Sequence, residues 1–220
     1  MILAVTGLRR EQRLLAVAGV EVVLGGDDLD LRAGGKQGII SIGIARALAP
    51  GLKPGDWVVA DAVRDRDDVL PTDRDWTHRL ASRLPTPRRG MFAGGDAMAA
   101  TAVEKAALHR ATGAIAVDME SHRAARAAER HGLPFAAARV ISDAADRTLP
   151  PAARVGMKSD GNVDLPAVLK SLVLAPWQLP ALIRTGLEAE TAFRALLRGH
   201  RMLGPGLASA DLGELPPDMV

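Results

Sequence analysis

Residues 114–143 read AIAVDMESHRAARAAERHGLPFAAARVISD, and this stretch decides the fold. Two short apolar runs, at residues 114–117 and 135–142, flank an Ala/Arg/Glu-rich stretch of helical period over residues 119–131. His131-Gly132 with Pro134 following predicts the end of that helix, because glycine can adopt the left-handed cap and proline cannot continue a helix. A strand, a helix and a strand in this order are typical of a parallel sheet covered by helices.

The same alternation extends along the chain. Apolar runs predict further buried strands at residues 2–6, 20–24, 38–43 and 57–63, and helical patterns occur at residues 9–18, 73–84, 99–111, 165–175 and about 179–198. We expect one α/β domain over residues 1–203, a three-layer αβα arrangement with a central mixed, mostly parallel sheet. Residues 204–220 are predicted to be a flexible C-terminal tail.

The composition narrows the classes of function. The chain has 220 residues, of which 48% are hydrophobic and 25% charged, so it can bury one large core. A net charge of only +2, with 3% aromatic residues and no tyrosine, argues against a nucleic-acid partner. The absence of cysteine excludes disulfides and thiolate chemistry, and the histidines lack metal-ligand spacing, so we expect neither a metal nor a cofactor. The N-terminus lacks the features of a signal peptide, and we expect a cytoplasmic location.

Acidic residues follow two of the predicted strands. Asp118 and Glu120 come just after the first strand of the quoted stretch, and Asp143 comes directly after the second. Open α/β sheets bind ligands at the carboxyl ends of their strands. An acid in this position also serves as a helix cap or turn residue, so the pattern alone leaves both interpretations open.

These residues resemble the nucleoside phosphorylase and methylthioadenosine/S-adenosylhomocysteine nucleosidase superfamily. The resemblance implies cleavage of the N-glycosidic bond of a purine nucleoside, adenine being the expected base. By resemblance Glu120 holds the ribose hydroxyls, Met119 packs against the sugar, and Asp143, oriented by Ser142, protonates the leaving base. A carboxyl group holds that proton near neutral pH only if burial or a neighbouring charge raises its pKa, and the apolar strand before Asp143 suits this role.

The similarity runs from residue 1 to about residue 145 and includes the first predicted helix. Glu11 matches the glutamate that activates the attacking water, although a glutamate in a first helical turn is equally explained by the helix dipole. In place of a glycine-rich loop the chain reads Gly43-Ile44-Ala45-Arg46-Ala47. The absence of two glycines either prevents the backbone from approaching the nucleophile closely, or allows Arg46 to supply positive charge at that place.

Water and phosphate both remain candidate nucleophiles. Gly7, Arg9 and the amides of Gly43, Ile44 and Ala45 are the expected cradle for phosphate as a co-substrate. Ser41-Ile42 stands where phosphorylases carry an arginine, which favours water. Met98, after Gly94-Gly95-Asp96, borders the base in the same comparison.

The chain most resembles the hopanoid-biosynthesis-associated phosphorylases, in residues 119–122, 131–135 and 158–164 and in its apolar C-terminal helices. That subgroup acts on adenosylhopane, so the resemblance implies a lipid-linked substrate, a peripheral membrane contact and a homo-oligomer. The alternative for the apolar helices is ordinary core packing. A non-catalytic nucleoside-binding protein is the rival function. The residues expected to line an apolar groove or face lipid headgroups are Leu165, Val168, Leu169, Leu172, Trp177, Leu179, Leu182, Ile183, Lys170, Arg184, Arg194 and Arg198.

Overall fold

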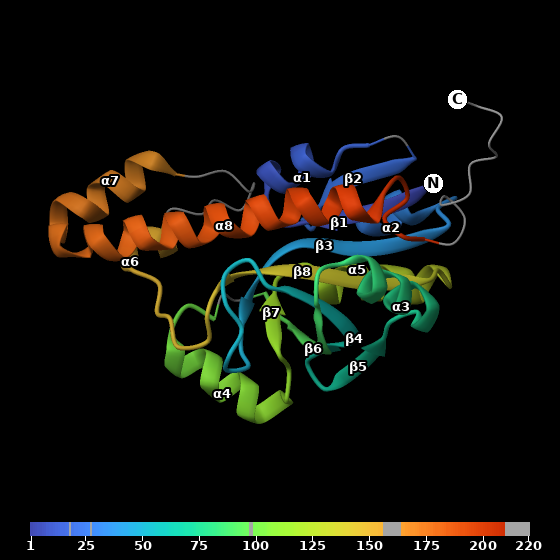
Figure 1. Cartoon of the computed structure of the whole chain (residues 1–220), viewed down its shortest axis with the longest axis horizontal. Helices are drawn as coiled ribbons and strands as arrows, with labels where there is room; N and C mark the ends of the chain where they lie inside the picture. The colour runs from blue at the N-terminus through green and yellow to red at the C-terminus, as the bar shows by residue number, and fades with distance from the viewer. Residues whose placement is uncertain (18, 27, 97–98, 156–163, 210–220) are drawn as a thin grey trace.

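A mixed sheet of eight strands forms the centre of the molecule, with helices packed around it (Figure 1). The computed structural model describes residues 1–17, 19–26, 28–96, 99–155 and 164–209. The α/β class and the central mixed, mostly parallel sheet are confirmed. The strands are β1 (Ile2–Thr6), β2 (Val20–Leu24), β3 (Gly38–Ala47), β4 (Trp57–Asp65), β5 (Asp68–Pro71), β6 (Arg88–Gly94), β7 (Ala116–Asp118) and β8 (Phe135–Asp143).

Five of the strands close into a ring. β3 pairs with β8, β8 with β4, β4 with β6, β6 with β7, and β7 returns to β3. β1 pairs in parallel with β3, and β2 pairs in parallel with β1. β5 pairs antiparallel with β4. Ring closure gives β8 a partner on both of its edges, so the strand that ends in Asp143 is held on both sides.

The helices begin and end at the residue types that physical chemistry favours. α4 starts with a capping box in which Thr101 and Glu104 each bind the other's backbone amide. α5 ends at Gly132, whose φ of 62° lies in the left-handed region, as the sequence predicted. The helices are α1 (Arg9–Leu15), α2 (Leu29–Ala33), α3 (Arg74–Arg83), α4 (Ala102–Thr112), α5 (Ser121–His131), α6 (Pro151–Val155), α7 (Leu165–Leu174), the 3-10 helix η1 (Pro176–Gln178) and α8 (Leu179–Leu203).

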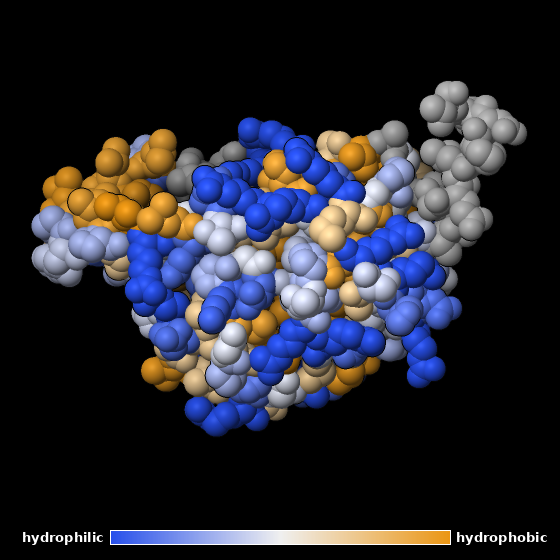
Figure 2. All heavy atoms as spheres, viewed as in Figure 1, coloured by the Kyte–Doolittle hydropathy of each residue, from blue (hydrophilic) through white to orange (hydrophobic). Residues whose placement is uncertain are grey.

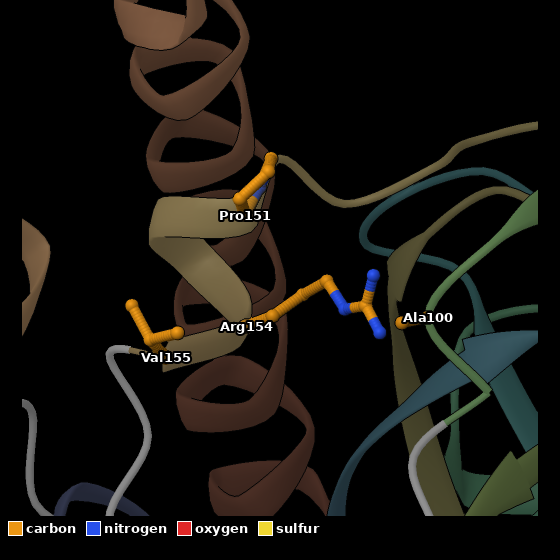
Figure 3. A pocket seen from close by; sticks show the side chains of 4 residues that line it. All are labelled: Ala100, Pro151, Arg154 and Val155. Carbon is orange, nitrogen blue, oxygen red and sulfur yellow. The ribbon is translucent and has the colours of Figure 1, made fainter. Parts of the chain in front are cut away.

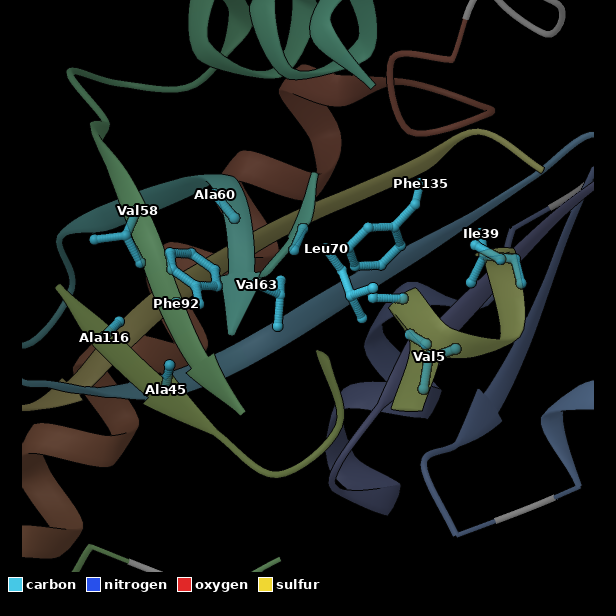
Figure 4. Packing of buried hydrophobic residues seen from close by; sticks show 14 of the residues in the cluster. Val5, Ile39, Ala45, Val58, Ala60, Val63, Leu70, Phe92, Ala116 and Phe135 are labelled. Carbon is cyan, nitrogen blue, oxygen red and sulfur yellow. The ribbon is translucent and has the colours of Figure 1, made fainter. Parts of the chain in front are cut away.

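The core fills the ring and continues beneath the helices. Each ring strand contributes buried apolar side chains to one cluster, which includes Phe92, Val63 and Ala45 (Figure 4). A second cluster, around Trp57 and Trp76, packs the other face of the sheet against α3 and α8. The alanines of α5 are buried, so this helix lies close to the sheet.

Some element boundaries differ from the sequence-based predictions. α1 ends at Leu15 rather than at residue 18, and β3 continues to Ala47 because it goes on to pair with β7 and β8. β5 and β6 were not predicted. Part of the expected tail is packed, since Leu207 and Ala208 are buried and the Trp76 indole donates a hydrogen bond of 2.8 Å to the Leu207 carbonyl. Residues 210–220 lie outside the described part of the chain.

The segment of residues 165–187, which we call the apolar hairpin, projects from the body of the protein (Figure 1). It comprises α7, η1 and the first part of α8, and none of the side chains of α7 is buried. Apolar residues cover its surface (Figure 2). Within the described residues no single helix has the length and hydropathy needed to cross a bilayer, and α7 with the segment after it passes that test only as a pair bent by 115°.

Candidate active site

Glu11 is held inside the protein by backbone amides. It lies in the first turn of α1 and is 1% exposed. Its Oε2 atom accepts hydrogen bonds from the amides of Gly7 and Leu8, both at 2.8 Å, and Oε1 accepts one from Ile44 at 2.7 Å. Burial raises the pKa of Glu11, although Arg139 and these amides favour the charged form. A fixed carboxylate with a raised pKa is suited to accept a proton.

Gly43 lets two charged side chains approach the backbone of β3. A Cβ atom at this position would lie 2.5 Å from Glu11 Oε1 and 2.7 Å from Arg139 Nη1. Both distances are shorter than real Cβ contacts, so any side chain here would displace one of the two groups. Steric crowding by Glu11 and Arg139 therefore explains why position 43 is a glycine.

Arg139 is a fully buried cation among three carboxylates. It comes from β8, and its Nη2 donates to Ser41 Oγ at 2.5 Å and lies 3.3 Å from an oxygen of both Asp118 and Glu120. Burial lowers the pKa of Arg139, but the surrounding carboxylates together raise it above its ordinary value. Its Nε and Nη1 atoms have no hydrogen-bond partner among the described residues.

Glu120 lies beside Arg139, and its side chain fits there because Gly7 and Gly25 have no Cβ atoms. A Cβ atom would come within 2.6 Å of Glu120 Oε1 if placed on Gly7, and within 2.5 Å of Glu120 Cγ if placed on Gly25. Burial raises the pKa of Glu120 to about 7, against the lowering effect of Arg139. This carboxyl group therefore changes its charge near neutral pH.

Asp118 orders the start of α5. Its Oδ1 accepts hydrogen bonds from the amides of Glu120 at 2.8 Å and Ser121 at 2.6 Å, and its Oδ2 accepts one from Ser121 Oγ at 2.6 Å. These are the bonds of a turn and helix-start residue. Of the two acids that follow this strand, Asp118 has the structural role and Glu120 remains for a ligand.

Asp143 ends β8 in a second buried cluster. Ser142 Oγ donates to its Oδ1 at 2.7 Å, so the predicted orienting contact is present. The ammonium group of Lys105, which is fully buried, donates to Oδ2 and also to the carbonyl of Ala144 at 2.9 Å. Apolar surroundings were expected for Asp143, and the structure places a cation there instead.

Arg46 adds a second cation beside Asp143. Its Nε lies 4.0 Å from Asp143 Oδ1, and its Nη1 donates to the carbonyl of Ala99 at 3.3 Å. Ala47, the other replacement in the loop, is fully buried in β3. Arg46 therefore places its positive charge beside Asp143, whereas the sequence interpretation had placed that charge at the nucleophile.

The two clusters lie along one pair of strands. In the β3–β8 ladder Gly43 pairs with Arg139, and Arg46 pairs with Asp143. Glu11, a buried carboxyl group of α1, therefore lies beside the middle of this ladder, and Asp143, which is hydrogen-bonded to an ammonium group, lies at its end.

The expected phosphate cradle is only partly assembled. The amides of Gly7 and Ile44 both donate to Glu11. Ala45 is buried within β3, and Arg9 is exposed at the start of α1. Two of the predicted anion-binding amides are thus used by a carboxylate of the protein itself.

Sequence reasoning did not single out Arg139 and Lys105, which the structure places in the candidate site. For two residues that it did single out, Met119 and Met98, the structure adds little. Arg139 carried a signal, since a lone arginine in an otherwise apolar strand must have buried partners. Lys105, in an exposed-looking helix, carried none. Met119 is 38% exposed next to Glu120, and Met98 lies outside the described residues.

A pocket of about 460 Å³ opens between α6 and the chain before α4 (Figure 3). Arg154 reaches from α6 towards Ala100, and Pro151 and Val155 also line the pocket. Burial lowers the pKa of Arg46 most, and the positive charge of nearby Arg154 lowers it further. Because α6 also packs on α7 and α8, the pocket lies between the Asp143 cluster and the apolar hairpin.

The fold is mixed α/β, and two buried carboxyl groups, Glu11 and Asp143, each lie beside a cation near the β3–β8 strand pair. The profile of the phosphorylase superfamily matches residues 10–161, and the chain belongs to that superfamily.

Solved structures share the fold. A methylthioadenosine/S-adenosylhomocysteine nucleosidase from Neisseria meningitidis, in complex with methylthio-immucillin-A, is 16% identical, with a TM-score of 0.65 over 90% of this chain and 96% of that one. A futalosine hydrolase from Helicobacter pylori is 17% identical, with a TM-score of 0.60 over 91% and 96%. The Streptococcus pneumoniae nucleosidase is 19% identical, with a TM-score of 0.57 over 90% and 98%. At these identities the likeness shows the fold alone.

Proposed function

We propose that the protein cleaves the N-glycosidic bond of a purine nucleoside, with adenine as the leaving base. The observation that carries this proposal is a pair of buried acids along the β3–β8 strand pair: Glu11 of α1, which binds the Ile44 amide beside Arg139, and Asp143, which ends β8 beside Lys105. Membership of the superfamily supports it. Similar folds belong to nucleosidases that were solved with nucleoside analogues.

The residues divide the reaction between them. A purine anion leaves poorly, so Asp143 protonates the base as the bond to the sugar breaks. Positive charge then develops on the sugar, and Glu120, which holds the ribose hydroxyls, binds this state more strongly than the substrate. Met119 packs against the sugar. Glu11 accepts a proton from the nucleophile.

We infer that the nucleophile is water. Hydrolysis needs one proton acceptor, and Glu11 fits that role because its carboxylate is buried and fixed by amides of Gly7 and Ile44. Phosphate would need those amides as donors. Dependence of the reaction on added phosphate would overturn the choice of water.

We further propose that the substrate is adenosylhopane, or another adenine nucleoside that carries a lipid on its 5′ side, and that the apolar hairpin rests on the membrane that contains it. The exposed residues of the hairpin are each between 46% and 82% accessible, which argues against the core-packing alternative. They are Leu165, Leu169, Val173, Leu174, Trp177, Leu179, Ile183 and Leu187.

The charges of the hairpin favour an anionic bilayer surface as its partner. Residues 165–187 contain Lys170 and Arg184 and no acidic residue. Both basic side chains are exposed, and a tryptophan at the tip suits the boundary between headgroups and acyl chains. The cytoplasmic location and the homo-oligomer implied by the resemblance remain predictions.

The chemistry is tested by following free adenine from adenosine, methylthioadenosine and adenosylhopane, with and without phosphate. Asp143→Asn and Glu11→Gln should each lower the rate by about 10²–10⁴-fold. Asp75→Asn, an exposed acid of α3, is the matched control and should retain the parent rate. Tight nucleoside binding without adenine release would instead favour the non-catalytic binding protein.

The membrane contact is tested by flotation with vesicles of phosphatidylcholine alone or mixed with phosphatidylglycerol. We expect binding to the anionic vesicles and its loss in Val173→Glu. Val103→Glu, at a valine of α4 that is 78% exposed, matches the 82% exposure of Val173 and should bind like the parent. A parent protein that floats with neither vesicle, and whose oligomer dissociates in Val173→Glu, would make a second copy of the chain the partner.

A further inference from the structure

Lys105 is a buried amine that the scheme above does not use. It lies in α4, is 0% exposed, and its ammonium group binds only Asp143 Oδ2 and the carbonyl of Ala144 among the described residues. A buried ammonium loses its hydration, so a fold retains one where it has a specific partner. Here that partner is the acid assigned to the leaving base.

We propose that Lys105 and Asp143 share one proton, that this proton is the one delivered to the leaving base, and that Lys105 therefore acts as the proton reservoir of Asp143. The proposal rests on the proposed function. Lys105 acts through Asp143, without itself contacting the base, and it also positions the carboxyl group.

The need for a reservoir follows from the charges around Asp143. An ammonium group within hydrogen-bond distance, and Arg46 Nε at 4.0 Å, both stabilise the carboxylate form, which has no proton to give. The proton of the pair then resides mainly on nitrogen. For Asp143 to protonate a base, it must draw that proton across its hydrogen bond with Lys105.

The surroundings of Lys105 make this transfer easier. Burial lowers its pKa most, and nearby Arg46 lowers it further, whereas Asp143 and Asp146 raise it, with a net shift below the ordinary 10.5. After burial, which lowers the pKa of Arg46 most, and Asp143, which raises it, Arg154 lowers that pKa and Glu104 raises it. An ammonium group of this kind is a stronger acid than a solvated lysine.

The step balances in atoms and charge. As the C1′–N9 bond breaks, its electron pair goes to the base, N7 takes a proton from Asp143, and Asp143 takes one from Lys105 Nζ. Water adds its hydroxyl to C1′ and gives its other proton to Glu11. Lys105 is left as a neutral amine and Glu11 as a neutral acid; after the products leave, Glu11 releases its proton to solvent and Lys105 takes one up, which restores the starting state.

The test compares pH–rate profiles of the parent, Lys105→Arg and Lys105→Met, measured as base release in single turnovers. Arginine keeps the charge but does not release its proton, so Lys105→Arg should lose about 100-fold or more at every pH. In Lys105→Met the carboxyl group holds the proton alone. Its activity should survive at low pH and fall off at least about one pH unit earlier than in the parent.

A substrate with a good leaving group separates this role from a structural one. A nitrophenyl riboside needs no protonation of its leaving group, so Lys105→Arg, Lys105→Met and Asp143→Asn should each lose at least about tenfold less activity on it than on the nucleoside. Lys53→Met, at an exposed turn residue, is the control and should match the parent on both substrates.

Each outcome decides one question. Parent-like rates and profiles in both Lys105 variants would overturn the reservoir while leaving the proposed function intact. Equal losses on the nucleoside and the nitrophenyl riboside would also overturn it, in favour of a structural role. A parent protein that cleaves neither substrate would overturn the proposed function itself.

Discussion

Glu120 makes the stability of the protein depend on pH near neutrality. Its side chain is 17% exposed, and burial raises its pKa from an ordinary 4.5 to about 7. A raised carboxyl pKa means that the folded state binds the proton more tightly than the unfolded state does. The resulting stability is fully present below pH 4.5 and is lost as the pH rises through about 7.

The size of this loss follows from the two pKa values. Their difference, at about 1.36 kcal/mol for each pH unit, corresponds to about 3 kcal/mol over the whole range, most of which falls between pH 5 and pH 8. Glu120→Gln removes the titration. The free energy of unfolding of the parent should therefore fall by roughly 2–3 kcal/mol more than that of Glu120→Gln over this interval.

The measurement is urea unfolding at a series of pH values, followed by the fluorescence of the buried Trp57 and Trp76. Glu129→Gln is the matched control, because Glu129 lies in the same helix with its side chain 57% exposed. Its stability profile should run parallel to that of the parent. Parallel profiles for the parent and Glu120→Gln as well, within about 0.5 kcal/mol, would refute the reasoning.

Three further predictions concern packing and buried charge. Arg139→Met should lower the free energy of unfolding by about 3–5 kcal/mol in the same assay, because it leaves buried carboxylates without their cation; a loss below about 1 kcal/mol would contradict this. Gly199→Ala should cost about 1–3 kcal/mol, since its Cβ would lie 2.3 Å from a buried indole, whereas Gly186→Ala in the same helix has open space and should be neutral or stabilising; equal effects on the melting temperature would count against the packing described. Gly43→Ala should lower nucleoside cleavage at least about tenfold by displacing Glu11, and unchanged kinetics would show that this close approach is unimportant.

The sequence predicted β1, β2, β3, β4, β7 and β8 from their apolar runs and did not predict β5 and β6. β1, β3 and β8 are largely apolar, which is what a strand covered on both sides requires. β6 begins with Arg88 and Arg89, both exposed, and β5 is a short edge strand. The place of β6 depends on ring closure and that of β5 on pairing with β4, and both are long-range properties that no local pattern contains.

Contacts between neighbouring residues of the site could be predicted from the sequence, whereas contacts that depend on how distant elements pack could not. Ser142 was expected to orient Asp143, and their hydrogen bond is present. Lys105 could not be found, because a lysine in an alanine-rich helix is usually solvated and only the packing of α4 against the end of β8 buries it. The roles assigned to Glu11 and Glu120 in the reaction remain predictions.

Pairing on both edges of β8 limits how this protein can vary. Side chains alternate between the faces of a strand, so adding or removing one residue in β8 before Arg139 would shift its pairing with Gly43 and turn its side chain away from its present partners. Asp143 lies beyond an irregularity at which Ala45 pairs with Ile141 and Arg46 with Asp143, so its orientation depends on that irregularity as well as on the length of the strand. Natural insertions and deletions that preserve activity should therefore fall in the segments before and after this strand, whose own length stays constant.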